Sequence, residues 1–454
     1  MFDKLQLVDD DKLKFVGHGG RSEMPSLNYV EALPDARPHT LSLIADLTDE
    51  QLIGPRLQIV NPLLWEIGHV AWFQEYWVLR HLNGRPPILV NGDALYDSAK
   101  VAHDTRWDLS LLSREKTLAY MQEVLERITD RYQDIKELDG QAEYFLSLAL
   151  FHEDMHDEAF GYTRQTLGYQ KPQFDESEAA PANRHVASDE NLGDAQISGG
   201  EFLLGSLPDR PFVFDNEMAA HMVQVQPFAI SRTAVANFEF AAFVDDGGYL
   251  REEFWSDDGW CWRQSVNATH PIYWQREGNQ WLRREFDQLV ALDPLLPVLH
   301  VNWFEADAFC RWAKRRLPTE VEWETAASIE PDGNSGNKRK RRFPWGDELA
   351  TTSANLDWQA GGCIDVRALP GGDSAFRCRQ MIGNVWEWTA SDFNPYPGFK
   401  AGPYKEYSAP WFGDHKVLRG GCWTTRWRMI HNAYRNFYKP DRRDVWAGFR
   451  TCAL

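Results

Sequence analysis

The chain has 454 residues, a formal net charge of −19 and a sequence pI near 5.2. This length exceeds one ordinary domain, so we expect at least two. The strong negative charge argues against nucleic acid or an anionic membrane as a partner. Residues 1–14 are mixed and charged, and no apolar run is long enough to cross a bilayer, so the sequence predicts a cytoplasmic protein without a membrane anchor.

The six cysteines all lie in the second half of the chain, and none forms a CxxC pair. This spacing matches neither a disulfide framework nor a zinc ribbon, and it favours a reducing compartment. We expect residues 1–35 to be a flexible arm, because they are charged and contain a GHGG run.

Residues 36–171 are expected to form a four-helix bundle with one long, loop-rich crossover at 84–112. Apolar periodicity predicts the helices at 36–47, 61–82, 113–138 and 141–167. In the second of these, Asn61 suits the N-cap and Pro62 the first helical position. That helix is apolar almost all round and should be buried, with His69 in its apolar stripe. A core histidine with a hydrogen-bonded ring is the alternative interpretation of His69.

The segment FHEDMHDEAFGY (151–162) carries two histidines four residues apart, His152 and His156. Four residues advance about 400° round a helix, so both imidazoles share one face and suit one metal ion. Glu158 comes six residues after His152 and points well away from the pair. A third ligand must then come from elsewhere, and His69 on a facing helix suits that role. The alternative is a solvated acidic helix with two incidental histidines.

Residues 172–192 are polar, acidic and rich in proline and alanine, which is typical of a linker. From 193 to 454 the sequence changes to short strand-like runs and glycine turns, with helical segments at 235–245 and 304–327. We therefore expect an α+β domain with much irregular structure. The predicted fold class of the whole chain is α plus α+β.

Residues 36–170 resemble the DinB-type bundle, whose iron motif HxxxHxE is matched by His152, His156 and Glu158. Residues 193–454 resemble the formylglycine-generating-enzyme type of C-type-lectin-like domain, through the segments GGEFLLG, LPTEVEWE, FPWG, GNVWEWT, RGG and GFR. The order of the two domains is that of the ergothioneine sulfoxide synthases and their relatives.

This resemblance implies a mononuclear non-haem Fe(II) held by His69, His152 and His156, with open positions for a substrate sulfur or selenium and for the co-substrate O2. Glu158 would then be a structural residue or would support a ligand from behind. The implied substrates are hercynine, which is Nα-trimethylhistidine, and a selenium or sulfur donor. We expect a monomer or a small homo-oligomer.

Two further roles follow from the resemblance. The family's active-site tyrosine lies in a Y-x-x-Y-S segment after a P-G-F turn, here PGF (397–399) and YKEYS (404–408), so Tyr404 would transfer a proton or an electron. An asparagine in an R-N segment contacts hercynine in the family, and here it is Asn436 in YRNFYKPDRR. An ordinary loop tyrosine is the alternative interpretation of Tyr404.

The chain departs from the actinobacterial ergothioneine enzymes that use γ-glutamylcysteine. Those enzymes offer two arginines to the substrate carboxylates, where this chain has His103 and Arg106. Their W-D pair, whose aspartate meets the substrate amine, is replaced by Phe437 and Tyr438. Their glutamine that contacts hercynine is Met155 here. One cationic and one anionic contact are missing, and an unpaired charged end disfavours that donor.

A neutral or sugar-like donor fits these changes better. The segments AHDTRW, NPLLWEIGHVAWFQEYWVLR and RNFYKPDRRD resemble the selenoneine synthase branch, which couples hercynine to a selenosugar. We therefore predict C–Se bond formation at imidazole C2 of hercynine, giving selenoneine through a selenoxide.

Several alternatives remain open. They are C–S bond formation from cysteine or γ-glutamylcysteine, a zinc-dependent thiol transferase, and a non-catalytic ligand-binding module. Oxidation of protein cysteines is disfavoured, because the two copper-binding cysteines of formylglycine-generating enzymes correspond to Thr425 and Ile430. Cys422 lies too close to the glycine turn to replace them, and we interpret it as a small buried residue.

Overall fold

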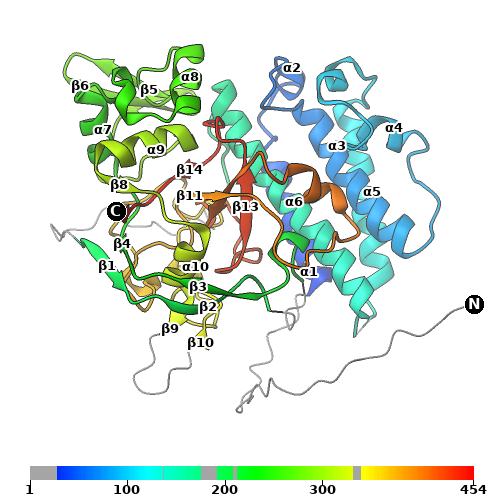
Figure 1. Cartoon of the computed structure of the whole chain (residues 1–454). Coiled ribbons are helices and arrows are strands. Elements are labelled where there is room, and N and C mark those ends of the chain that lie inside the picture. Colours follow the sequence, from blue (N-terminus) through cyan, green and yellow to red (C-terminus); the bar gives the residue numbers. More distant parts are fainter. Residues whose placement is uncertain (1–27, 136, 175–191, 208–211, 331–338) are drawn as a thin grey trace, which may run out of the picture.

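The computed structural model of the protein describes residues 28–135, 137–174, 192–207, 212–330 and 339–454. A helical domain, blue to cyan in Figure 1, lies beside a mixed domain that runs from green to red. This arrangement confirms the predicted fold class. Most of the expected arm and of the expected linker fall outside the described residues, so the domain boundaries stay predictions.

Helices make up the first domain. They are α1 (Tyr29–Ser42), α2 (Asp49–Ile53), α3 (Leu63–Gln74), α4 (Gly92–Tyr96), α5 (Arg114–Tyr132) and α6 (Gly140–Leu167). A π-helix, η1 (Glu75–Leu82), continues α3 without a break. The long helices form the bundle, with α3 packed on α5 and α6, and α1 packed on α6.

The helix ends differ from those expected. Helix α1 begins at Tyr29 instead of 36, inside the stretch expected to be flexible. The buried residues Tyr29, Leu33 and Ala36 lie at helical spacing, and their burial outweighs the two prolines inside the helix. Helix α3 begins one residue later than expected, because the side chain of Asn61 accepts a hydrogen bond from Arg106 and does not cap the helix.

The described residues of the second domain form four longer helices. They are α7 (Asn237–Asp245), α8 (Asp257–Val266), α9 (Trp303–Trp312) and α10 (Glu320–Ser328). The single helix expected at 304–327 is therefore two helices. Between them Arg315–Arg316 form strand β8, which pairs with β15 (Cys452–Ala453), and Thr319 then caps α10. Pairing with the C-terminal strand overrides the local helical pattern.

Within the described ranges of this domain, the strands form two four-stranded sheets and three smaller ones. In spatial order the strands of the larger sheets are β1 (Asp194–Ile197), β4 (Phe228–Ser231), β15 and β8, and β13 (Arg435–Tyr438), β12 (Lys416–Arg419), β11 (Trp386–Asp392) and β14 (Ala447–Gly448). The smaller sheets are β2 (Gly200–Leu204) with β3 (His221–Val225), β5 (Trp274–Glu277) with β6 (Gln280–Glu285) and β7 (Gln288–Ala291), and β9 (Ile329–Glu330) with β10 (Arg339–Lys340).

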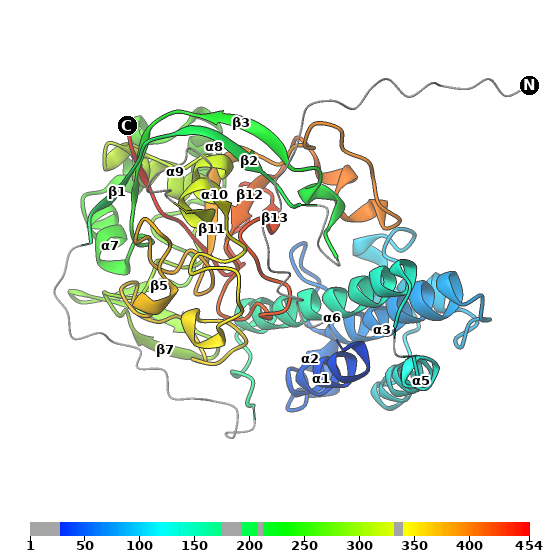
Figure 2. The ribbon, with the colours of Figure 1, turned by 90° about the horizontal axis from the view of Figure 1, so that it is seen from below.

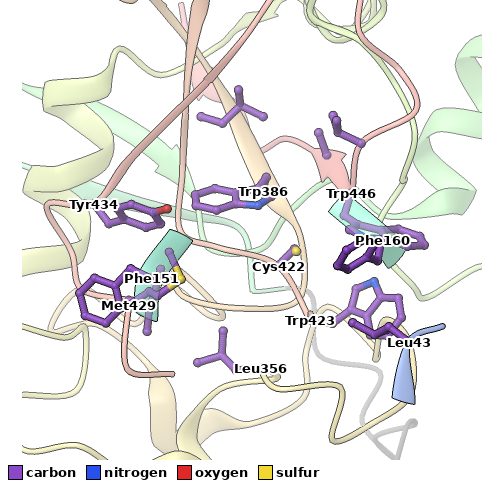
Figure 3. Packing of buried hydrophobic residues seen from close by; sticks show 14 of the residues in the cluster. Leu43, Phe151, Phe160, Leu356, Trp386, Cys422, Trp423, Met429, Tyr434 and Trp446 are labelled. Atoms are coloured by element: carbon purple, nitrogen blue, oxygen red, sulfur yellow. The ribbon is translucent and has the colours of Figure 1, made fainter. Parts of the chain in front are cut away.

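Helix α6 joins the two domains through a shared core. Figure 2 shows this helix running from the bundle to the second domain. Close up, Phe151 and Phe160 of α6 belong to one buried cluster with residues of the second domain, Phe151 near Met429 and Phe160 near Trp446 (Figure 3). The hydrophobic core is thus continuous across the boundary. Within the described ranges, no helix combines the length and apolar character that a membrane span requires.

Candidate metal centre at the domain interface

Three histidines converge between α3 and α6. One ring nitrogen from each of His69, His152 and His156 lies within 4.8 Å of the other two. The ring centroids of His152 and His156 are 4.5 Å apart, and that of His69 lies 5.0 Å and 5.2 Å from them. This separation suits three ligands of one metal ion. The structure thus brings together the three residues that the sequence singled out.

Hydrogen bonds orient two of the three rings. Nδ1 of His69 lies 2.7 Å from the backbone oxygen of Tyr96, and Nδ1 of His156 lies 2.8 Å from Oε1 of Glu66. When Nδ1 donates its proton to an oxygen in this way, Nε2 carries the lone pair that binds a metal. The crossover loop supplies the partner of His69, and α3 itself supplies the partner of His156.

Packing orients the third ring. His152 stacks on Phe73 with 3.6 Å between centroids and 3° between planes. Burial lowers the pKa of both His69 and His152 well below the usual histidine value, and the neighbouring His156 lowers it further. Neutral imidazoles are the form that binds a metal. His69 and His152 are each 3% exposed, whereas the side chain of His156 is 18% exposed, so the cluster opens on the side of His156.

Glu158 lies outside the histidine cluster, as the helical geometry predicts. Its Oε1 accepts a hydrogen bond from Trp386 Nε1 at 2.7 Å, and its Oε2 accepts one from Thr425 Oγ1 at 2.8 Å. Burial raises the pKa of Glu158 above the usual glutamate value. Both partners belong to the second domain, so the two hydrogen bonds of Glu158 stabilise the contact between α6 and that domain. Cys422 is fully buried beside it, as expected.

Glu158 belongs to a row of α6 residues that contact the second domain, here called the docking stripe. The stripe consists of Asp154, Glu158, Gly161 and Gln165. Arg428 binds both carboxylate oxygens of Asp154, at 2.6 and 2.7 Å. A Cβ at Gly161 would come within 2.9 Å of the Trp358 ring, so only glycine allows this close approach. The stripe lies on a different face of α6 from the histidines.

Tyr404 extends from the second domain toward the cluster. Its ring centroid lies 4.9 Å from that of Phe73 and 6.2 Å from that of His152. Burial raises the pKa of Tyr404 above the usual tyrosine value, and the charge of Glu406 adds to this effect. The phenol therefore stays protonated at neutral pH and is a hydrogen donor. The predicted tyrosine thus lies beside the histidines.

Strand β13 presents alternate residues to its two faces. The phenol of Tyr438 lies toward α6, where burial and the nearby Tyr162 raise its pKa well above the usual value, and the side chain of Asn436 contacts it. Phe437 has the opposite orientation and stacks on Phe393 with 4.0 Å between centroids. Strand alternation thus places Phe437 in an aromatic cluster on the face opposite Tyr438, and a role for Phe437 in substrate binding stays a prediction.

The predicted donor-site residues His103 and Arg106 sit in the crossover loop. Nη1 of Arg106 donates to Asn61 Oδ1 at 2.5 Å, and its Cζ lies 3.9 Å from the centre of the Trp65 ring. Nε2 of His103 lies 2.8 Å from the backbone oxygen of Val60. Both side chains thus bind the start of α3, and they border the helix that carries His69.

The chain was compared with known proteins. Residues 180–453 match the sulfatase-modifying factor enzyme 1-like domain, and residues 32–159 match the DinB superfamily. The chain is 37% identical over 428 residues to a hercynine oxygenase from Mycolicibacterium thermoresistibile, covering 92% of this chain and 93% of that protein. The chain belongs to the hercynine oxygenase family. A hercynine oxygenase from Mycobacterium tuberculosis is 37% identical over 423 residues, covering 92% and 96% of the two chains.

The second domain also has relatives outside the hercynine oxygenase family. A formylglycine-generating enzyme from Streptomyces coelicolor is 32% identical over 312 residues, covering 61% of this chain and 93% of that protein. In this member of the hercynine oxygenase family, Thr425 binds Glu158 and Ile430 is fully buried. Thr425 therefore contributes to the contact between α6 and the second domain, and Ile430 fills the core.

The sequence did not indicate two polar residues that lie beside the histidine cluster, Glu66 and Tyr162. Glu66 precedes His69 by three residues, and Tyr162 follows Met155 by seven, so each shares a helix face with a predicted residue. Met155 and Tyr162 are both partly exposed, on the side of α6 next to the histidines. This helical spacing could have indicated Glu66 and Tyr162, but many residue pairs in helices have the same spacing. The residues that contact Glu66 and Tyr162 lie far away in the chain, so no local pattern distinguishes the two.

Proposed function

We propose that this member of the hercynine oxygenase family is a non-haem Fe(II) enzyme that uses O2 to join imidazole C2 of hercynine to a chalcogen. The observation that carries the proposal is the cluster of His69, His152 and His156 in a chain 37% identical, over 92% of its length, to a hercynine oxygenase. Three imidazole ligands leave room for further ligands. The iron, when bound, would activate O2 and bind the chalcogen.

The reaction balances with one molecule of O2. The C2–H bond of hercynine and the chalcogen–H bond of the donor break, and a carbon–chalcogen bond forms. One oxygen atom enters the selenoxide or sulfoxide, and the other leaves as water with the two hydrogens. O2 accepts four electrons, two from bond formation and two from oxidation of the chalcogen.

The chain's own residues have distinct tasks in this proposal. Tyr404 holds a proton at its phenol oxygen and delivers it on the side of His152. Asn436 orients hercynine through its amide nitrogen, since its Oδ1 already accepts a hydrogen bond of 2.8 Å from the backbone of Phe437. Met155, partly exposed next to the histidines, gives the bound ring an apolar contact.

The finer proposal concerns the donor, which we take to be a selenosugar that yields selenoneine through a selenoxide. Arg106 and His103 are already bound to Asn61 and to a backbone oxygen, so they offer a weak clamp for two carboxylates. Tyr438 offers a phenol where enzymes that use γ-glutamylcysteine have an aspartate, and a phenol suits a sugar hydroxyl. Ergothioneine sulfoxide synthesis from cysteine or γ-glutamylcysteine fits the family equally well, because the relatives' name does not specify the donor.

A donor competition tests both levels of the proposal. The protein is reconstituted with Fe(II) without oxygen, given hercynine, and then exposed to O2 with selenosugar, γ-glutamylcysteine and cysteine together. Mass spectrometry should show a dominant hercynyl–selenium product. A dominant sulfur product would overturn the selenium donor and support the ergothioneine alternative. No product from protein that has bound iron would overturn hercynine as the substrate.

A further inference from the structure

We propose that Glu66 has two roles, in which one carboxylate oxygen positions the metal ligand His156 and the other binds the imidazole N–H of the substrate. This inference rests on the proposed function. It starts from the different hydrogen-bonding states of the two oxygens of one buried carboxylate.

The first oxygen acts through His156. Glu66 is 2% exposed on α3, and its Oε1 lies 2.8 Å from Nδ1 of His156. A carboxylate accepts but never donates, so this contact fixes the proton on Nδ1 and leaves Nε2 for the metal. Glu66 is therefore a positioning residue for one of the three ligands.

The second oxygen is buried and has no hydrogen-bond partner among the described residues. Arg106 is close enough for Glu66 to act on its pKa, but no hydrogen bond joins the two side chains. Nη1 of Arg106 donates to Asn61, its Cζ lies over the Trp65 ring, and its Nε has no partner among the described residues. Tyr162 also lies within electrostatic reach of Glu66. A buried carboxylate oxygen without a donor is costly, so a bound molecule that supplies a donor gains affinity by filling this position.

The chemistry of hercynine identifies that donor. Its quaternary ammonium carries no N–H, and its carboxylate only accepts, which leaves the imidazole N–H as its sole hydrogen-bond donor. The imidazole is also the ring that reacts, and it must lie next to the histidine cluster. Oε2 of Glu66 belongs to the group that holds His156, so it is placed to receive this N–H.

Two substitutions separate the two roles. In Glu66→Gln the amide oxygen can still accept from His156, but the amide NH2 then faces the substrate N–H, a donor against a donor. In Glu66→Leu both contacts disappear. The control is Glu75→Gln on the adjoining η1, because Glu75 is 1% exposed and accepts from Tyr120 at 2.6 Å, outside the cluster.

The experiment uses the full-length chain with Co(II) as the metal probe. Visible absorption gives the affinity for Co(II), and calorimetry gives the affinity for hercynine without a second substrate. Glu66→Leu should weaken Co(II) binding about 10- to 100-fold. Glu66→Gln should keep Co(II) affinity within about 10-fold while weakening hercynine about 10- to 100-fold. Glu75→Gln should match the wild type in both, and thermal melting checks that each variant folds.

A second ligand tests which part of hercynine meets Glu66. Phenylalanine betaine keeps the trimethylammonium and carboxylate but has no ring N–H, so its affinity should be the same for wild type and Glu66→Gln. Equal losses for both ligands would show that Glu66 attracts the ammonium and would overturn the N–H contact. Wild-type affinity for hercynine in Glu66→Gln would overturn the second role, and wild-type Co(II) affinity in Glu66→Leu would overturn the first. A wild type that binds Co(II) but no hercynine would instead refute the proposed function.

Discussion

The two faces of α6 differ in whether the buried polar atoms compared here have hydrogen-bond partners. On the docking stripe every carboxylate oxygen of Asp154 and Glu158 has a partner from the second domain. On the histidine face, Nδ1 of His152 and Oε2 of the adjacent Glu66 are buried and have no hydrogen-bond partner in the part of the chain that the structure describes. The paired carboxylates hold the two domains together, and the unpaired His152 nitrogen and Glu66 oxygen lie where a metal and a substrate are expected to bind.

Replacing a histidine breaks the histidine face most completely. His152→Ala removes one of three ligands, so we expect loss of both stoichiometric iron binding and turnover. Elemental analysis after anaerobic reconstitution measures the first, and product formation measures the second. The control is His221→Ala, because His221 of β3 belongs to the second domain and not to the cluster. A fully active His152→Ala would exclude this site as the metal centre.

The role of Tyr404, which lies beside the histidine face, is tested by removing its phenol oxygen. Tyr404→Phe keeps the ring contacts with Phe73 and His152, so iron binding should persist. The rate of product formation should fall about 100- to 10,000-fold, because the proton donor is lost. Tyr169→Phe at the end of α6 is the control, since its hydroxyl binds only the Gln51 backbone among the described residues. Equal rates for the two variants would remove Tyr404 from the mechanism.

Removing one ion-pair partner breaks the docking stripe without touching the histidines. Arg428→Met leaves the buried Asp154 with only a 4.0 Å contact to Arg426, so we expect a loss of up to about 3–5 kcal/mol in unfolding free energy. Denaturant unfolding followed by tryptophan fluorescence measures this loss. The exposed pair of Arg56 with Asp108 supplies the control, and Arg56→Met should change stability by less than about 1 kcal/mol. Equal losses of unfolding free energy for the two substitutions would mean that the buried pair of Arg428 and Asp154 stabilises the protein no more than an exposed ion pair does.

Adding one methyl group gives the smallest expected effect on the stripe. In Gly161→Ala the new Cβ would lie 2.9 Å from the Trp358 ring, so we expect about 1–3 kcal/mol of destabilisation from overpacking. Gly140→Ala at the start of the same helix is the matched control, because its Cβ would meet no atom within 4 Å. There alanine should be neutral or slightly stabilising. Thermal melting of both variants, which should differ in sign or size, sharpens the contrast along one helix.

The histidine cluster was predictable because its geometry is mostly local. His152 and His156 lie one helical turn apart, and that relation depends on the helix alone. His69 was harder, because its role depends on α3 facing α6, which apolar periodicity alone suggests but does not prove. The solvated-helix alternative is wrong, since His152 and its carboxylate neighbours Glu153 and Asp154 are buried.

What the sequence missed depends on distant parts of the chain. Glu66 meets His156 across 90 residues, and no local pattern indicates that pairing. The break between α9 and α10 arises because β8 pairs with the C-terminal strand, so the helical periodicity on either side could not show it. Phe437 is a different case, because its orientation could be predicted from the sequence. Neighbouring residues of a strand point to opposite faces of the sheet, so Phe437 and Tyr438 should lie on opposite faces.

The docking stripe also sets an order of events during protein synthesis. The partners of Asp154 and Glu158 come 228 to 274 residues later in the chain. At about 5–20 residues per second, the ribosome completes the helix with the histidines roughly ten seconds to a minute before it completes those partners. Throughout that interval the side of the bundle that the second domain later covers is exposed to water, and its acidic residues are hydrated instead of paired.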